Sequence, residues 1–421
     1  MTSSPPQAGF LIANRHALTT ILEASQTKSI IASRDIFDIS GTKLWARDQP
    51  VSQALQRKLL DRQLRQPLES CLIAENGVSS RSLLLAVEKL LEQDTPLKPL
   101  LQAHADDIVH ATVHLPIHPV AQLLLTAGQA SRPESFDHAV QAMALCGAVA
   151  ISHGGSTREL RVAMLCGLLH DLGEMYIDPR FGEADSDRAL DFRSYQQLVV
   201  HPHIGKLLVE QLTNYPAEVA LAIAEHHERL DGSGYPHCLR RDQVSTLGRM
   251  LAVVEGTLGA LRKDHPHLSH ASVALRVVPG EYDLSWVGPV SHAARTQPVL
   301  QPSLSIDEIN TRLAKLGDAL QAAQSNASSL LAMAQTPSYK AALELAQHLL
   351  SRLQLGWNAS GLWSQHAVAA QDSAEVEAIE DELMFRLRAI QRAALLCAGK
   401  LPEEEALQLN LLCVGIAVDA E

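Results

Sequence analysis

Side chains that bind metals recur at the ends of apolar helical segments in the middle of the chain. His170 and Asp171 follow the apolar run 162–169, and His226 and His227 end another segment of helical periodicity. A buried imidazole or carboxylate is costly unless it is paired, and a metal ion is a common partner. This feature predicts a helical core built around a metal site.

The candidate ligands are separated by about one helix and one connection. Consecutive helices can therefore each present one or two ligands to a common centre. Imidazole and carboxylate ligands without thiolates suit iron and manganese first, with zinc as an alternative. The candidates exceed the needs of one ion, so two divalent ions are expected, with three as the alternative. The candidate ligands are Glu134, His138, His170, Asp171, His201, His226, His227 and Glu255.

The composition favours a mainly α, helical fold. Of the 421 residues, 46% are hydrophobic and only 4% are aromatic, and Leu, Ala and Gln are frequent. The net charge is -12, whereas domains that bind nucleic-acid polymers carry a basic face. A nucleic-acid polymer is therefore not an expected partner. A small anionic substrate remains compatible, because bound metals supply positive charge locally.

The cysteines and the N-terminus bear on the compartment. Six cysteines are scattered without a Cys-x-x-Cys motif, a usage typical of a reducing compartment. The N-terminus shows no basic segment followed by an apolar one, and no apolar stretch approaches membrane-spanning length. We expect a cytoplasmic protein without membrane insertion.

The chain is predicted to contain four parts. Residues 1–27 are expected to be a tail without assignment. Residues 28–112 are predicted to form a small mixed regulatory unit, a hairpin followed by helices. Residues 113–300 carry the candidate ligands. Residues 301–421, rich in Ala, Leu, Gln and Glu, are predicted to form a C-terminal helical bundle.

Helical periodicity locates the expected helices. In the N-terminal unit they cover residues 52–64 and 80–93. In the central part they cover residues 134–152, 159–173, 192–213, 216–229 and 244–262. In the C-terminal part they cover residues 306–335, 338–355, 374–399 and 402–418.

The stretch from His226 to Pro236 resembles the signature of the HD-GYP subfamily of HD phosphohydrolases. It contains the His-His-Glu group, an Asp-Gly pair and a final Gly-Tyr-Pro, and the His170-Asp171 doublet resembles the superfamily's HD motif. The resemblance covers about residues 115–295. Six of the candidate ligands fall on the family's metal positions: His138, His170, Asp171, His201, His226 and His227. Glu134 falls where members with three metals carry an extra carboxylate.

The resemblance implies a helical-bundle phosphodiesterase of bacterial second-messenger signalling. Such proteins hydrolyse cyclic di-GMP to pGpG or GMP with two or three metal ions. Asp171 is then the expected catalytic residue, bridging two ions. The expected substrate-binding residues are Arg229, Asp231, Gly232, Gly234, Tyr235 and Pro236.

Two positions depart from the family pattern. Glu174 stands where the family has lysine, so a carboxylate replaces a cation expected to meet substrate phosphate, and such repulsion can redirect specificity. Glu255 stands where the family has aspartate, which adds one methylene to a ligand. Arg229 is expected to offset part of the missing positive charge.

Three functions remain open from the sequence. The first is a metal-dependent cyclic di-GMP phosphodiesterase. The second is a catalytically impaired cyclic-dinucleotide sensor or scaffold whose N- or C-terminal unit contacts a signalling protein. The third is a phosphohydrolase retuned to another nucleotide. The full set of ligand positions favours an enzyme, and Glu174 favours a changed substrate.

Overall fold

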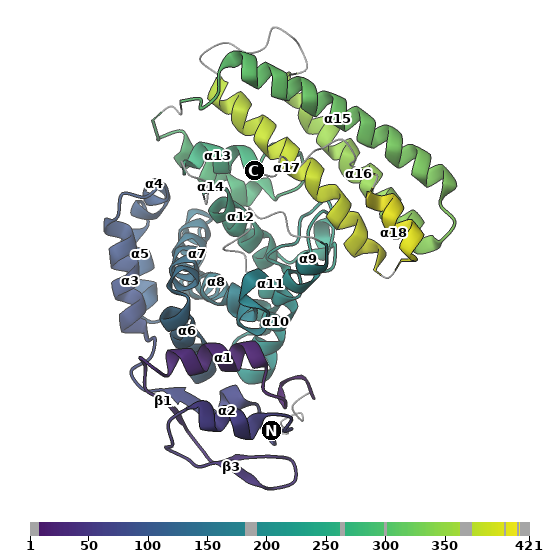
Figure 1. Cartoon of the computed structure of the whole chain (residues 1–421). Coiled ribbons are helices and arrows are strands. Elements are labelled where there is room, and N and C mark those ends of the chain that lie inside the picture. Colours follow the sequence, from purple (N-terminus) through teal and green to yellow (C-terminus); the bar gives the residue numbers. More distant parts are fainter. Residues whose placement is uncertain are drawn as a thin grey trace. The chain divides into compact units, whose positions relative to one another are not determined.

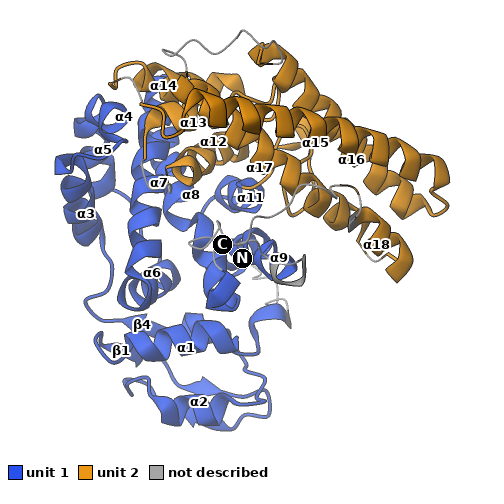
Figure 2. Cartoon of the chain, turned by 45° about the horizontal axis from the view of Figure 1, so that its top comes forward, with its two compact units in different colours: residues 1–226 blue, residues 227–421 orange. Residues whose placement is uncertain are grey.

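The computed structural model describes residues 8–181, 192–261, 266–298, 301–362, 373–399, 401–410 and 412. Within these residues the protein is mainly helical, with two small two-stranded sheets (Figure 1). The predicted fold class is therefore confirmed. The chain divides into two compact units, residues 1–226 and residues 227–421 (Figure 2).

The strands of the first unit form the predicted hairpin and one further pair. β2 (Ile36–Phe37) pairs antiparallel with β3 (Lys43–Trp45), as the sequence predicts. β1 (Ile30–Ala32) instead pairs with β4 (Leu72–Ala74), far along the chain. The alternating residues of β1 thus bury one face against a distant strand, a pairing that local patterning does not reveal.

A helix lies in the segment expected to be a tail. α1 (Arg15–Ala24) begins after Asn14, whose Oδ1 accepts hydrogen bonds from the backbone N–H of His16 at 2.9 Å and of Ala17 at 3.1 Å. This is a standard N-terminal cap. The helix packs against α6 (Pro119–Ser131). Residues 15–24 are thus helical and part of the first unit.

Short helices connect the strands to the core of the first unit. They are α2 (Gln53–Leu59), η2 (Leu68–Cys71), α3 (Ser80–Glu92), α4 (Lys98–Gln102), α5 (Ala105–Val113) and α6. Helices at α2 and α3 were predicted, whereas α4, α5 and α6 were not. α6 is buried around most of its surface, so it lacks the alternation of polar and apolar faces that the sequence analysis relied on.

The core helices of the first unit follow the predicted segments. They are α7 (Pro133–Ser152), α8 (Thr157–Leu169), η3 (His170–Tyr176), η4 (Pro179–Phe181), α9 (Phe192–Leu198), α10 (His201–Leu212) and α11 (Ala217–Glu225). The predicted helix 192–213 is two helices, because Pro202 lies in the first turn of a new one. The predicted helix 159–173 ends as α8 at Leu169 and continues as the 3-10 turn η3.

Capping and close packing position the end of α8. Ser156 and Glu159 form a capping box at its start, with Ser156 N–H donating to Glu159 Oε2 at 2.7 Å. At its other end a Cβ on Gly167 would lie 2.5 Å from the carbonyl oxygen of Ala142, so only glycine permits this approach of α8 to α7. A Cβ on Gly173, in η3, would overlap the carbonyl oxygen of His201.

The second unit contains the long helices of the predicted bundle. Its helices are η6 (Arg241–Gln243), α12 (Thr246–Ala260), α13 (Leu268–Ala274), α14 (Leu284–Ala294), α15 (Ile306–Met333), α16 (Pro337–Ser360), α17 (Ser373–Ala398) and α18 (Glu403–Asn410). α15, α16 and α17 pack on one another, and α13 packs on α17. Most of the predicted stretch 411–418 lies outside the described residues.

The compact units divide between His226 and His227, inside the predicted part 113–300. In the second unit α12 packs on α13, and α13 packs on the C-terminal helix α17. The predicted domain boundaries at 27/28, 112/113 and 300/301 stay predictions. None of the described helices combines the length and the hydrophobicity needed to cross a membrane.

The buried side chain of Glu69 forms a hydrogen bond with Tyr176, the last residue of η3. Tyr176 Oη donates to Glu69 Oε1 at 2.5 Å, while Glu69 Oε2 accepts no hydrogen bond from the residues that the structure describes. Burial raises the pKa of Glu69, and the hydrogen bond from Tyr176 offsets this only in part. Burial therefore favours the neutral, protonated form of Glu69.

We expect the Glu69→Gln variant to change how stability depends on pH. An acid with a raised folded-state pKa contributes stability that is complete below its unfolded pKa and is lost as pH rises through the folded pKa. The variant should match the wild type below pH 4.5, the ordinary value for glutamate, and should exceed it increasingly above that. Thermal unfolding between about pH 4 and pH 9 measures this. A difference in melting temperature that does not vary with pH would contradict it.

Candidate metal centre

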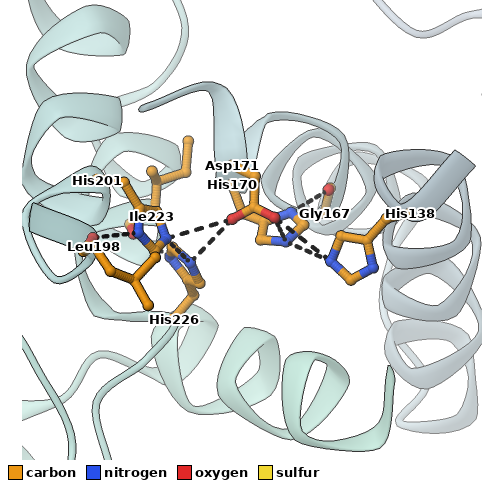
Figure 3. A network of polar contacts seen from close by, with 8 residues as sticks. All are labelled: His138, Gly167, His170, Asp171, Leu198, His201, Ile223 and His226. Atoms are coloured by element: carbon orange, nitrogen blue, oxygen red, sulfur yellow. Dashed lines mark hydrogen bonds and ion pairs between the residues drawn. The ribbon is translucent and has the colours of Figure 1, made fainter. Parts of the chain in front are cut away.

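Four histidines and one aspartate meet in the first unit, where the ends of several helices come together (Figure 3). His138 lies on α7, His170 and Asp171 begin η3, His201 begins α10, and His226 follows the last residue of α11. His170, His201 and His226 are fully buried. The structure thus brings five of the predicted ligands together from segments far apart in the sequence.

Three of the histidines share one backbone contact, which sets their tautomer. In each, Nδ1 lies within hydrogen-bond distance of the carbonyl oxygen three residues earlier. The contacts are His170 to Gly167 at 2.8 Å, His201 to Leu198 at 2.8 Å and His226 to Ile223 at 2.6 Å. A carbonyl oxygen only accepts, so each Nδ1 carries a proton, and each ring in its neutral form presents the lone pair of Nε2.

These lone pairs point at one another. The Nε2 atoms of His201 and His226 lie 3.1 Å apart, and those of His138 and His170 lie 3.2 Å apart. Two neutral rings of the same tautomer have no proton to share between His201 and His226, so this contact is repulsive by itself. A bound cation removes the repulsion, because metal ligation uses these Nε2 lone pairs. The donor set fits a divalent metal ion.

Asp171 lies between the two histidine pairs (Figure 3). Its Oδ2 is 3.1 Å from His170 Nε2 and 3.5 Å from His138 Nε2, and its Oδ1 is 3.5 Å from His201 Nε2 and 3.4 Å from His226 Nε2. Oδ1 is buried and accepts no well-formed hydrogen bond within the described part of the chain. Each carboxylate oxygen therefore faces one pair of imidazoles.

Asp171 is held in its ionised form. Burial by itself would raise the pKa of Asp171, but in the metal-free site positive charge on the facing imidazoles, His170 first, holds it well below its usual value. In each of two groups that share Asp171, the ligand atoms lie within 4.8 Å of one another. The groups contain His138, His170 and Asp171 in one case, and Asp171, His201 and His226 in the other. Asp171 belongs to both groups, and this set of ligand atoms fits a divalent metal site.

Glu228 holds the loop formed by residues 227–239 of the second unit, here called the motif loop. Its side chain is buried, and its Oε1 accepts a hydrogen bond from His237 N–H at 2.7 Å while Oε2 accepts one from Leu239 N–H at 2.8 Å. Glu228 belongs to the signature motif, but the sequence does not predict this role for it. Its partners lie 9 and 11 residues later in a loop, so no periodic pattern signals the contact.

The remaining motif residues shape the same loop. A Cβ on Gly234 would overlap the backbone of His227 and Arg229, so only glycine permits this close approach of the chain to itself. The predicted substrate contact of Gly234 stays a prediction. The Tyr235 ring stacks on the His227 ring, with centroids 4.4 Å apart. The oxygen Oδ1 of Asp231 accepts hydrogen bonds from the N–H and hydroxyl groups of its neighbour Ser233.

The backbone has an uncommon conformation at two places among the predicted substrate-binding residues. Gly232 has a φ of +87°, which L side chains rarely adopt. The peptide bond between Tyr235 and Pro236 is cis. Both belong to the loop that Glu228 holds.

The comparisons with known proteins fit this geometry. Residues 125–278 match the family model described as "HD domain". This part of the chain is an HD domain. The match includes the His-Asp doublet, and with the signature at 226–236 it confirms the resemblance to HD-GYP-type phosphohydrolases.

The HD domain is also similar in sequence to curated bacterial proteins. The chain is 33% identical over 167 residues to "Cyclic di-GMP phosphodiesterase PA4108" of Pseudomonas aeruginosa, covering 39% of each chain. It is 32% identical over 112 residues to "Cyclic di-GMP phosphodiesterase response regulator RpfG" of Xanthomonas campestris, covering 26% of this chain and 29% of that one. It is 24% identical over 157 residues to "3'3'-cGAMP-specific phosphodiesterase 1" of Vibrio cholerae, covering 37% and 36%.

These similarities are partial. The chain spans less than half of the length of each of these relatives. No solved structure matches it.

Other predicted site residues of the HD domain occupy varied positions. Glu134 lies exposed in the first turn of α7, outside both ligand groups. Glu174 is buried in η3, three positions after Asp171 of the His-Asp doublet. In the second unit, His227 is buried at the start of the motif loop, and Glu255 is buried on α12.

Arg229 packs within the second unit. Its guanidinium carbon lies 4.7 Å from the centroid of the Tyr282 ring, and its Nη1 donates to the carbonyl oxygen of Glu228 at 2.9 Å. Burial alone would lower the pKa of Arg229, but Tyr282 and Glu281 raise it, so the side chain is cationic. The substrate-binding role of Arg229 stays a prediction.

Proposed function

We propose that the protein is a metal-dependent phosphodiesterase that hydrolyses cyclic di-GMP to pGpG or GMP in bacterial second-messenger signalling. The observation that carries the proposal is the ionised carboxylate of Asp171 between two pairs of imidazoles. The names of two relatives, cyclic di-GMP phosphodiesterases of Pseudomonas and Xanthomonas, support the substrate.

The metal would be held at two positions. His138 and His170 would serve one, His201 and His226 the other, and Asp171 both. Histidine and carboxylate ligands without thiolate favour iron or manganese. When bound, such ions activate water and neutralise phosphoryl oxygens.

Three further ligands complete the proposal. We assign His227, which follows His226 in the chain, and the buried carboxylate of Glu255 as additional ligands. Glu134 would serve a third ion, because it lies one helical turn before His138 on α7.

The chain's own residues prepare the site before substrate arrives. The carbonyl oxygens behind His170, His201 and His226 hold each ring in one orientation and one tautomer, which keeps Nε2 available. The motif loop, with Asp231, Gly232, Gly234, Tyr235 and Pro236, would form the edge of the substrate pocket. Arg229 would add a positive charge towards the phosphate.

A second candidate function is hydrolysis of a different cyclic dinucleotide. Glu174 replaces a lysine expected to meet phosphate, and one relative is named as specific for 3'3'-cGAMP. The third candidate, a sensor without turnover, would use the N- or C-terminal unit to contact a signalling protein. In each case the proposed setting is the cytoplasm, where cyclic dinucleotides are made and read.

Incubation of metal-loaded protein with cyclic dinucleotides tests these candidates. The protein is purified without oxygen, loaded with iron or manganese, and its bound metal is counted before cyclic di-GMP or 3'3'-cGAMP is added. Bound metal with formation of pGpG or GMP supports the proposal. Turnover of 3'3'-cGAMP alone selects the second candidate, and bound metal without any turnover selects the third. Protein that retains no metal would overturn the site.

A further inference from the structure

The C-terminal bundle reaches the motif loop through one arginine. Arg386 lies on α17, and its side chain is only 12% exposed. Its three guanidinium nitrogens make contacts with three different acceptors. Nε donates to Glu281 Oε2 at 2.7 Å, Nη1 to Glu382 Oε2 at 2.6 Å, and Nη2 to the carbonyl oxygen of Ala274 at 2.6 Å. Only the fork of an arginine reaches such a set of acceptors.

The other end of this contact touches the signature. Glu281 accepts a hydrogen bond at its backbone oxygen from Leu230 N–H, at 2.9 Å. The next residue, Tyr282, places its ring under the guanidinium of Arg229 at 4.7 Å. Leu230 and Arg229 belong to the signature, so two neighbouring residues connect Arg386 to it.

Arg386 holds this connection in place for electrostatic reasons. Glu281 and Glu382 are both buried carboxylates, and each needs a nearby cation. Arg386 supplies that charge to both, so α17 cannot shift relative to residues 281 and 282 without leaving a buried charge unpaired. Hydrogen bonds to charged groups in a buried site are also stronger than neutral ones.

We infer that Arg386 is a positioning residue for Arg229, and that the C-terminal bundle is part of the substrate-binding machinery through the contact of Arg386 with Glu281. Arg386 acts through Glu281 and Tyr282 and does not itself meet substrate. The inference rests on the proposed function for the role of Arg229, but the connection from Arg386 through Glu281 to Leu230 is independent of that role.

The test compares Arg386→Gln with Arg388→Gln, an exposed arginine on the same helix. In metal-loaded protein, Arg386→Gln should raise KM for cyclic di-GMP about tenfold, equivalent to about 1.4 kcal/mol. The value of kcat and the bound metal should stay within about twofold of the wild type. Arg388→Gln should leave all three unchanged. An unchanged KM in Arg386→Gln, or a parallel loss of kcat and bound metal, would overturn the inference.

A second readout does not depend on catalysis. Amide hydrogen exchange at Leu230 should accelerate about tenfold in Arg386→Gln and not in Arg388→Gln, because Glu281 no longer fixes its partner. If the wild type turns over no cyclic dinucleotide, the proposed function fails while this readout still tests the contact. Unchanged exchange at Leu230 would overturn the inference whatever the activity.

Two further variants guard against misfolding. Arg386→Lys keeps a positive charge but loses the fork, so it should fold and show intermediate values of KM and exchange. The triple variant Arg386→Gln, Glu281→Gln, Glu382→Gln removes all three buried charges, a change that proteins often tolerate. It should fold and still show the raised KM. A triple variant with wild-type KM would refute the positioning role.

Discussion

Asp171→Asn should lose its bound metal and about a thousandfold of phosphodiesterase activity. Asparagine has the same shape, but it exchanges one carboxylate oxygen for an NH2 group and removes the negative charge. That charge faces two pairs of imidazoles at 3.1 to 3.5 Å. Metal-ion catalysis supplies several kcal/mol, and about 4 kcal/mol corresponds to a factor of about a thousand.

The stability of this variant distinguishes a metal site from a structural one. In metal-free protein the asparagine NH2 donates to an Nε2 lone pair, so we expect a melting temperature equal to that of metal-free wild type or higher. The matched control is Asp137→Asn, which removes the same charge from an exposed position beside His138. Metal analysis, thermal unfolding and turnover are measured on all three proteins. Full metal content in Asp171→Asn would contradict the assignment.

Gly173→Ala should destabilise the first unit by about 3 kcal/mol, the upper part of the usual range for overpacking. A methyl group at this position would overlap the carbonyl oxygen of His201 and lie 2.8 Å from the backbone nitrogen of Gly205. Both neighbours are backbone atoms of α10, so η3 and α10 must move apart. Because His201 begins α10, metal affinity should fall as well.

The control for this variant is a glycine with open space around it. Gly128 lies on α6, and a Cβ there has no neighbour within 4 Å. Gly128→Ala should be neutral or stabilising by up to about 1 kcal/mol, as helix propensity predicts. Urea unfolding and metal content are measured for both. Equal unfolding midpoints for Gly173→Ala and the wild type would show that η3 does not rest on α10 as described.

The candidate site could be predicted in part because its signal is local. The apolar run before His170 and the doublets at 170–171 and 226–227 are visible in short windows of sequence, and the spacing between groups matches one helix with one connection. In the structure Asp171 shares one group of possible ligands with His138 and another with His201. Glu134 shares a helix with His138 but is exposed. Its spacing predicts that it lies on the same face of the helix as His138, and does not predict whether that end of the face is buried.

The contacts that hold the site in position were not predictable. The i−3 carbonyl contacts of the three histidines depend on how each helix ends, and the approach of Gly173 to His201 depends on how η3 packs on α10. The two loop contacts of Glu228 follow no periodicity. Such contacts join positions through space, and a pattern of apolar residues carries no information about them.

The sequence by itself determined the helical class, most of the long helices, and the kinds of side chain available to a metal. These follow from periodicity and chemistry within a few turns of chain. Only the tertiary structure decided that Asp171 lies between two pairs of imidazoles, and that Arg386 on α17 binds Glu281. Arg386 and Glu281 are separated by 105 positions in the chain. Such residues meet only when the helices pack, because packing buries charged side chains from distant segments and each of them then needs a partner of opposite charge.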